Sequence, residues 1–185
     1  MSGNKYRPHI CVLPEDDANR QIANGFLTNF NVAMKSINIL PIANGWGRVL
    51  KEFLQNHAEP MRRNTASYFI LLFDFDTDGT RLEYFRNQIP SGMHSRVFMI
   101  GTWTEPEKLR SDTKSNLEQL GATLASECFE NRRELWNHEL LRHNLRELDR
   151  LCCLSRVPAR SRESRICKSS ARADRRDPAR ETDLC

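Results

Sequence analysis

The stretch SYFILLFDFDTDG, residues 67–79, narrows the choice of fold more than any other part of the sequence. Its first half is an unbroken run of large apolar side chains, and its second half holds Asp74, Asp76 and Asp78. Such a run is typical of a strand that is covered on both faces, as in a parallel α/β sheet. Open α/β sheets bind their ligands beyond the carboxyl ends of the strands, which is where these aspartates fall.

The chemistry of the three aspartates predicts a metal site. Carboxylates this close together repel one another unless a cation or a basic group lies between them. Sites made only of oxygen atoms favour hard divalent ions, here Mg²⁺ or Mn²⁺. Successive residues of a strand point to opposite faces, so Asp74 and Asp76 share a face while the chain stays extended.

The rest of the first 110 residues repeats a strand–turn–helix order. We expect strands at 9–13, 36–42, 68–73 and 96–100, and helices at 17–29, 48–57 and 80–87. This order implies parallel strands that are joined by right-handed crossovers. The predicted fold is therefore α/β, with a mainly parallel sheet flanked by helices.

Beyond the fourth expected strand the sequence is helical and then changes character. Helices are expected at 111–120 and at 123–150, the latter as one bent helix or two. We divide the chain into an α/β domain (1–110), a C-terminal helical cap (111–151) and a basic tail (152–185).

The tail has almost no large apolar periodicity and is predicted to be disordered. Residues 151–185 hold nine Lys or Arg against five Asp or Glu, which equals the formal net charge of +4 of the whole chain. The body is therefore neutral, and whole-chain basicity does not indicate nucleic-acid binding by the domain. A basic nucleic-acid arm and a frameshift-like terminus after Leu151 are the alternatives for the tail.

Two features of the sequence predict the cell compartment of the protein. No segment approaches the roughly 18 apolar residues of a membrane span, and the N-terminus lacks the pattern of a secretory signal. We expect a cytoplasmic protein with no membrane partner. The six cysteines form no Cys-x-x-Cys pair, so reduced thiols without a metal or redox role are expected.

The order of the acidic residues resembles the TOPRIM fold of topoisomerases, bacterial primases and OLD-family nucleases. Glu15 follows the first expected strand, as the family glutamate does, and Asp74-x-Asp76-x-x-Gly79 matches the second family motif. The resemblance covers residues 9–105. Among TOPRIM proteins, the chain is most similar in its organisation to the OLD-related nucleases. Asp16 departs from the pattern, because many TOPRIM proteins have glycine after the glutamate.

The resemblance implies a metal-dependent nuclease or a related phosphotransfer domain. Glu15, Asp74 and Asp76 would be the catalytic metal ligands for Mg²⁺ or Mn²⁺, with Asp78 as a weaker ligand. Nucleic acid would be the substrate, and a second protein chain would be a partner.

Three residues after the fourth strand are accessory candidates at the same edge. Either Glu105 or Glu107 would complete a second metal position, and Lys108 would contact a phosphate group.

Two other functions stay open. One is a non-catalytic TOPRIM-like module that binds metal, nucleotide or protein. The other follows from the DxDGT sequence at 76–80, which matches the opening motif of haloacid-dehalogenase-like phosphatases. In that family Asp76 would be the phosphoryl-accepting nucleophile and Asp78 the acid/base.

Overall fold

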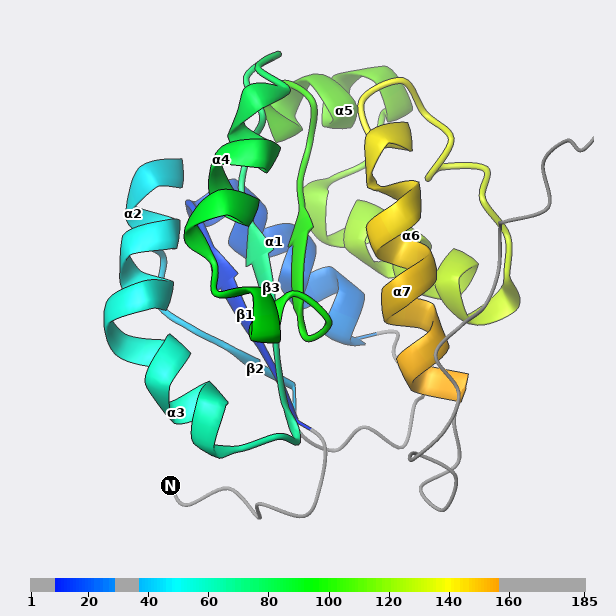
Figure 1. Ribbon diagram of the computed structural model, residues 1–185. Coiled ribbons are helices and arrows are strands. Elements are labelled where there is room, and N and C mark those ends of the chain that lie inside the picture. Colours follow the sequence, from blue (N-terminus) through cyan, green and yellow to red (C-terminus); the bar gives the residue numbers. More distant parts are fainter. Residues whose placement is uncertain (1–8, 29–36, 157–185) are drawn as a thin grey trace, which may run out of the picture. The chain divides into compact units, whose positions relative to one another are not determined.

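The computed structural model describes residues 9–28 and 37–156 (Figure 1). Within these residues, four parallel strands form one sheet in the order β2-β1-β3-β4. The strands are β1 (His9–Pro14), β2 (Ile37–Ile39), β3 (Ser67–Leu72) and β4 (Val97–Ile100). The α/β fold and the apolar strand before Asp74 are therefore confirmed, whereas the second strand is shorter than the expected 36–42.

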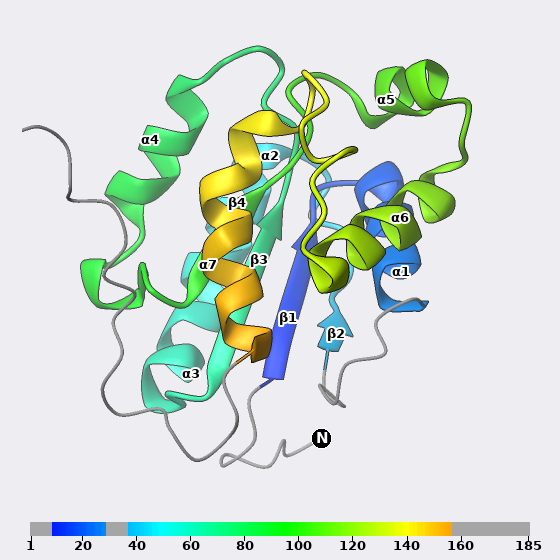
Figure 2. The ribbon, with the colours of Figure 1, turned by 90° about the vertical axis from the view of Figure 1, so that its right-hand side faces the viewer.

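Helices cover both faces of this sheet (Figures 1 and 2). One face carries α1 (Asp17–Thr28), α5 (Pro106–Thr113), α6 (Leu117–Glu130) and α7 (Leu145–Arg156), whose apolar side chains form one hydrophobic core. The other face carries α2 (Trp46–Glu52), the π-helical turn η1 (Phe53–His57), α3 (Ala58–Arg63) and α4 (Thr80–Gln88), which form a second core. The short 3₁₀ turns η2 (Ser91–Met93) and η3 (Arg142–Asn144) complete the set.

The strand order places a topological switch point between β1 and β3. From β1 the chain crosses to β2 on one side, and β3 then pairs with the opposite edge of β1 before the chain continues to β4. Pro14 is in register with Leu72, so the two strands end level with each other. Open α/β sheets bind ligands in the crevice at such a point, beyond the carboxyl ends of the strands.

The helical region after β4 differs from the prediction. Instead of helices at 111–120 and 123–150, α5 ends before Lys114, whose φ is 54°, and α6 is a new helix with its own cap at Asn116. The Asn116 side chain accepts a hydrogen bond from the Gln119 amide, and the Gln119 side chain bonds back to the Asn116 amide. This reciprocal capping box starts a helix at Leu117.

A non-helical loop separates α6 from η3 and α7, so the region expected at 123–150 as one bent helix or two contains two separate helices. The buried Glu127 carboxylate accepts hydrogen bonds from the backbone amides of Leu135 and Trp136, at 2.8 and 3.3 Å. The Trp136 indole donates to the carbonyl of Leu124 at 3.1 Å. These contacts fold the loop back onto α6.

The helices α1 and α6 touch through their backbones. A Cβ atom on Gly25 would lie 1.9 Å from the Glu118 carbonyl oxygen, and one on Gly121 would lie 2.0 Å from the Ile22 carbonyl oxygen. Only glycine permits this approach from both sides. The segment predicted as a cap thus shares a hydrophobic core with the first helix of the α/β region.

Three further expectations concern the chain as a whole. No helix in the described part of the chain is both long and apolar enough to cross a membrane. The expectation of reduced thiols is wrong for Cys128, which is disulfide-bonded, whereas Cys11 is a free thiol. Disorder is predicted for the tail (152–185). Of these residues, 157–185 lie outside the described part of the chain.

Candidate functional site

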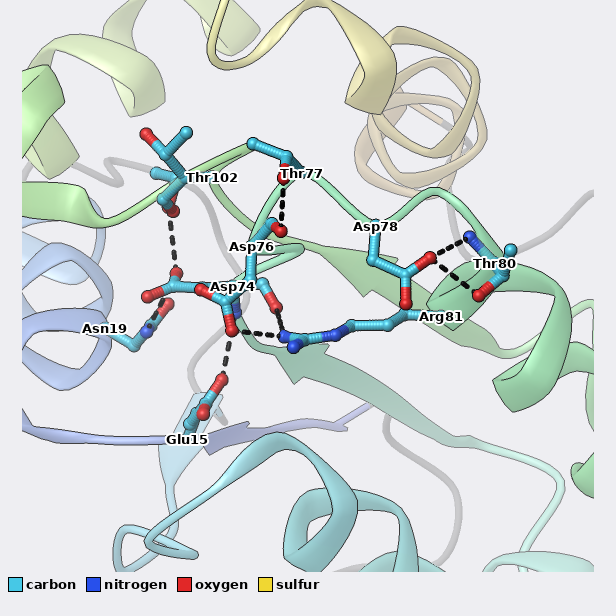
Figure 3. A network of polar contacts seen from close by, with 10 residues as sticks. Glu15, Asn19, Asp74, Asp76, Thr77, Asp78, Thr80, Arg81 and Thr102 are labelled. Atoms are coloured by element: carbon cyan, nitrogen blue, oxygen red, sulfur yellow. Dashed lines mark hydrogen bonds and ion pairs between the residues drawn. The ribbon is translucent and has the colours of Figure 1, made fainter.

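Acidic residues from two neighbouring strands meet at the β1/β3 switch point. Glu15 and Asp16 follow β1, while Asp74 and Asp76 follow β3. The Asp74 amide donates a hydrogen bond to Glu15 Oε2 at 3.0 Å (Figure 3). The predicted approach of Glu15 to the Asp74 segment is therefore present in the structure.

The charges of these four carboxylates act on one another. Burial raises the pKa of Glu15, and the nearby charges of Asp16 and Asp76 raise it further, although backbone amides of Asp74 and Trp46 oppose the change. Carboxylates whose pKa values are raised by burial and by like charges are candidates for a functional site.

Asp74 is the most enclosed member of the group, with 7% of its surface exposed. Burial is the main reason that its pKa is raised to about 7, and the charges of Glu15 and Asp16 add to the effect. Asp74 Oδ1 lies 2.8 Å from the Thr102 hydroxyl oxygen and accepts a hydrogen bond from Asn19 Nδ2 at 3.3 Å. These two hydrogen bonds oppose the rise in pKa.

The Thr102 hydroxyl has two acceptors beside it. It donates to Asp74 Oδ1 at 2.8 Å and lies 2.5 Å from the carbonyl oxygen of Thr104. A hydroxyl carries one hydrogen, so Thr102 shares it between these two oxygens.

Asn19, from the first turns of α1, connects the acidic residues of the two strands. Its Nδ2 donates to Asp16 Oδ1 at 3.0 Å and to Asp74 Oδ1 at 3.3 Å. Two carboxylate acceptors beside one amide nitrogen fix which end of the side chain is oxygen. Asn19 is only 1% exposed, and its Oδ1 has no hydrogen-bond partner in the described part of the chain.

Asp76 lies in a strained turn. The Asp78 amide donates to the Phe75 carbonyl at 2.8 Å, and the two residues between them, Asp76 and Thr77, have positive φ angles of 46° and 62°. Left-handed backbone is tolerated by glycine, asparagine and aspartate but is unfavourable for the β-branched threonine. The turn ends the extended segment after Asp74, so the predicted sharing of one strand face by Asp74 and Asp76 does not apply at Asp76.

Arg81, on the first turn of α4, holds this turn in place. Its Nη1 forms an ion pair with Asp76 Oδ2 at 2.7 Å and donates to the Asp74 carbonyl at 2.8 Å (Figure 3). The guanidinium carbon lies 4.7 Å from the centre of the Trp46 ring. A basic group thus already compensates part of the negative charge.

The Asp78 carboxylate turns away from the other acids and toward α4 (Figure 3). Its Oδ1 accepts hydrogen bonds from the amide and the hydroxyl of Thr80, at 2.9 and 2.6 Å, and these bonds lower its pKa. A lowered pKa is unfavourable for a general acid at neutral pH, so this geometry adds nothing to the phosphatase reading.

The three accessory candidates surround the start of α5. Glu105 and Glu107 are exposed there. The Lys108 ammonium pairs with Asp112 at 2.8 Å and lies 4.0 Å from Glu139. Lys108 is thus engaged with acids of the helical region.

Sequence reasoning missed Asn19 and Arg81 as members of the site. Asn19 has a local signal, since an aspartate three residues before an asparagine at a helix start indicates a cap, and Asp16 indeed accepts from the Asn19 amide at 2.9 Å. Arg81 has none, because a lone arginine in the first turn of a helix does not indicate which carboxylate it meets.

The donor atoms suit a hard divalent cation in their chemistry, although they are not gathered as a metal site. Among the described residues, no three or more His, Cys, Asp or Glu side chains are arranged so as to hold a metal ion. One carboxylate oxygen of each of Asp74, Asp76 and Asp78 is bound to a protein group instead. The unpaired Asn19 Oδ1 is a further oxygen of the type that such ions accept.

The sequence matches no protein-family model, and no curated protein or solved structure is significantly similar to it.

Proposed function

We propose that the chain is a TOPRIM-like, Mg²⁺- or Mn²⁺-dependent nuclease or phosphotransfer domain. The observation that carries the proposal is the contact between Glu15 and the Asp74 amide at 3.0 Å, because it brings the acidic end of β1 to the acidic end of β3. This meeting at the switch point is the arrangement that the Glu15 and Asp74-x-Asp76 motifs require.

In this proposal Glu15, Asp74 and Asp76 would hold the cation, with Asp16 and Asn19 Oδ1 beside them. A bound divalent ion would supply charge stabilisation for a phosphate group and lower the pKa of a water molecule. The residues of the chain would orient the phosphate over the β1/β3 boundary. Asp78 would keep its hydrogen bonds to Thr80 at the start of α4.

Cleavage of supercoiled plasmid DNA in the presence of Mg²⁺ or Mn²⁺ tests the proposal. We expect wild-type activity that is lost on chelation and in the variants Asp74→Ala and Asp76→Ala, both of which should remain folded by circular dichroism. Asp149→Ala is the matched control, because Asp149 is an exposed aspartate of α7 that forms an ion pair with Arg133. Equal activity of the wild type and the site variants would contradict the proposal.

The alternative is a TOPRIM-like module that binds metal, nucleotide or protein without turnover. It is favoured by one observation, namely that Asp76 is already paired with Arg81 and Asp74 with Thr102 and Asn19. Calorimetric binding of Mn²⁺ that is lost in Asp74→Ala, with no cleavage of DNA or RNA, would identify this function.

A further inference from the structure

The core between the sheet and the helices α1, α6 and α7 contains a partly open cavity of about 90 Å³. Figure 2 shows how these three helices lie over one face of the sheet. The lining of the cavity is almost entirely apolar, with side chains from the strands (Ile10, Ile70) and from the helices (Ile22, Leu124, Leu151). The described residues therefore leave space within this core.

An apolar cavity of this kind suits an organic molecule better than water. Protein interiors are close-packed, and a void lowers stability in proportion to its volume. A buried water needs two to four polar partners, which apolar walls do not offer. A cavity of roughly 150 Å³ with Leu, Ile and Phe walls stays dry and takes up benzene or xenon. The cavity in this core is smaller, so its walls fit a small aliphatic group.

The end of the cavity near the carboxyl ends of the strands has a different chemistry. Among the lining residues that the structure describes, Asn19 and Thr102 have side-chain oxygens. The Thr102 hydroxyl has two acceptors, Asp74 Oδ1 and the Thr104 carbonyl oxygen, so its one hydrogen is already used. Thr102 therefore does not require a ligand.

Asn19 does have an unused polar atom. Its Nδ2 donates to Asp16 and to Asp74 (Figure 3), and these bonds fix Oδ1 as the other end of the amide. Asn19 is 1% exposed, and Oδ1 has no hydrogen-bond partner within residues 9–28 and 37–156. A buried acceptor without a partner is costly. A molecule in the cavity that carries one hydrogen-bond donor would remove this cost.

We propose that the cavity is a binding site for a small aliphatic molecule with one hydroxyl or N–H group. The alkyl part lies against the apolar walls, and the donor binds Asn19 Oδ1. Asn19 then contacts the ligand through Oδ1 and the acidic residues through Nδ2. This inference goes beyond the proposed nuclease or phosphotransfer function and needs no metal ion.

Methyl NMR spectroscopy of the full chain, with labelled isoleucine and with EDTA present, locates the binding. Xenon and 1-butanol should each shift the methyl signals of Ile22 and Ile70 in a saturable way. Ile89 belongs to the core on the other face of the sheet and is the internal reference. Absence of saturable shifts at the lining isoleucines with both probes would overturn the site.

A second pair of probes tests the donor. Diethyl ether is an isomer of 1-butanol that cannot donate a hydrogen bond. The wild type should bind 1-butanol more tightly than the ether by about fivefold, as one hydrogen bond allows. Asn19→Ala should lose this preference and still bind xenon. Asn19→Cys, which lacks a strong acceptor, is the second variant should Asn19→Ala unfold. Equal binding of the two isomers by the wild type, or a preference that persists in the folded Asn19 variant, would overturn the proposal.

Filling the cavity is the remaining test. Val12→Ile adds one methylene group at the lining and should weaken 1-butanol binding by about fourfold. Val97→Ile is the matched control, because Val97 is a buried strand valine of the other core. Ala23→Leu, also at the lining, fills more of the space and is the second variant. Equal affinities of Val12→Ile, Ala23→Leu and Val97→Ile for 1-butanol would show that it binds elsewhere and would overturn the site.

Discussion

The Glu15 carboxylate accepts a hydrogen bond from the Asp74 amide at 3.0 Å, so a side chain leaving β1 is fixed to the backbone leaving β3. This single contact crosses the switch point of the sheet. It connects two residues whose pKa values are both raised, chiefly by burial. Stability, pH and any cation bound at this edge are therefore expected to be linked.

The raised pKa of Asp74 predicts a pH-dependent stability. Because the pKa is about 7 in the folded protein and near 3.8 when unfolded, the folded state binds the extra proton, and stability falls as the pH rises through this range. Each pKa unit corresponds to about 1.4 kcal/mol, so the full effect is at most a few kcal/mol.

Urea denaturation of the wild type and Asp74→Asn between pH 4.5 and 8 isolates this group. Titrations of groups that do not act on Asp74 cancel in the difference, including that of His143, whose pKa burial lowers to about 4. We expect Asp74→Asn to gain stability relative to the wild type as the pH rises. A pH-independent difference would contradict the assignment.

Gly101, after β4, is expected to tolerate no side chain. A Cβ atom there would lie 1.6 Å from the Phe73 carbonyl oxygen, in the backbone that leads to Asp74. Gly101→Ala should lower the free energy of unfolding by about 3 kcal/mol or more, since backbone must move. Gly92→Ala is the control, because nothing lies within 4 Å of a Cβ at that position. Similar melting temperatures for the two variants would show that this close approach is not real.

Relief of backbone strain at Thr77 should stabilise the protein. Its φ of 62° is unfavourable for a β-branched residue and tolerated by asparagine. We expect Thr77→Asn to raise the free energy of unfolding by about 0.5–1 kcal/mol. Thr65→Asn, an exposed threonine without a positive φ, should change it little. Chemical denaturation measures both, and a destabilised Thr77→Asn would refute the strain.

Glu127 is expected to matter for the loop between α6 and α7. Glu127→Ala removes the acceptor for the Leu135 and Trp136 amides, so we expect a loss of about 2–3 kcal/mol. Glu127→Gln retains one acceptor oxygen and should lose less. The near-ultraviolet circular dichroism of Trp136 reports on the loop, and an unchanged signal in Glu127→Ala would argue against this role.

The sheet and the meeting of its acidic ends could be predicted because their signals are local. The apolar run at 68–73 marks a central strand by itself, and parallel strands bring their carboxyl ends to one edge, as Glu15 and Asp74 demonstrate.

The orientation of the carboxylates could not be predicted. Asp76 meets Arg81, and Asp74 meets Thr102, through rotamers and a left-handed turn that tertiary packing selects. The bounds of the helices after β4 could not be predicted for a similar reason. Charged residues with intermittent leucines suit a long helix, whereas the buried Glu127 binds the amides of a loop instead.

The glycine contact between α1 and α6 limits how far the chain can be shortened for expression. Asn19 reaches the carboxylates from a helix whose far side rests, main chain against main chain, on residues that a cut at position 110 would delete. Such a fragment would keep every acidic motif but lose α6, which packs against α1. Boundaries for recombinant work therefore belong beyond α7, which shares this core, even though the acidic candidate residues all precede α6.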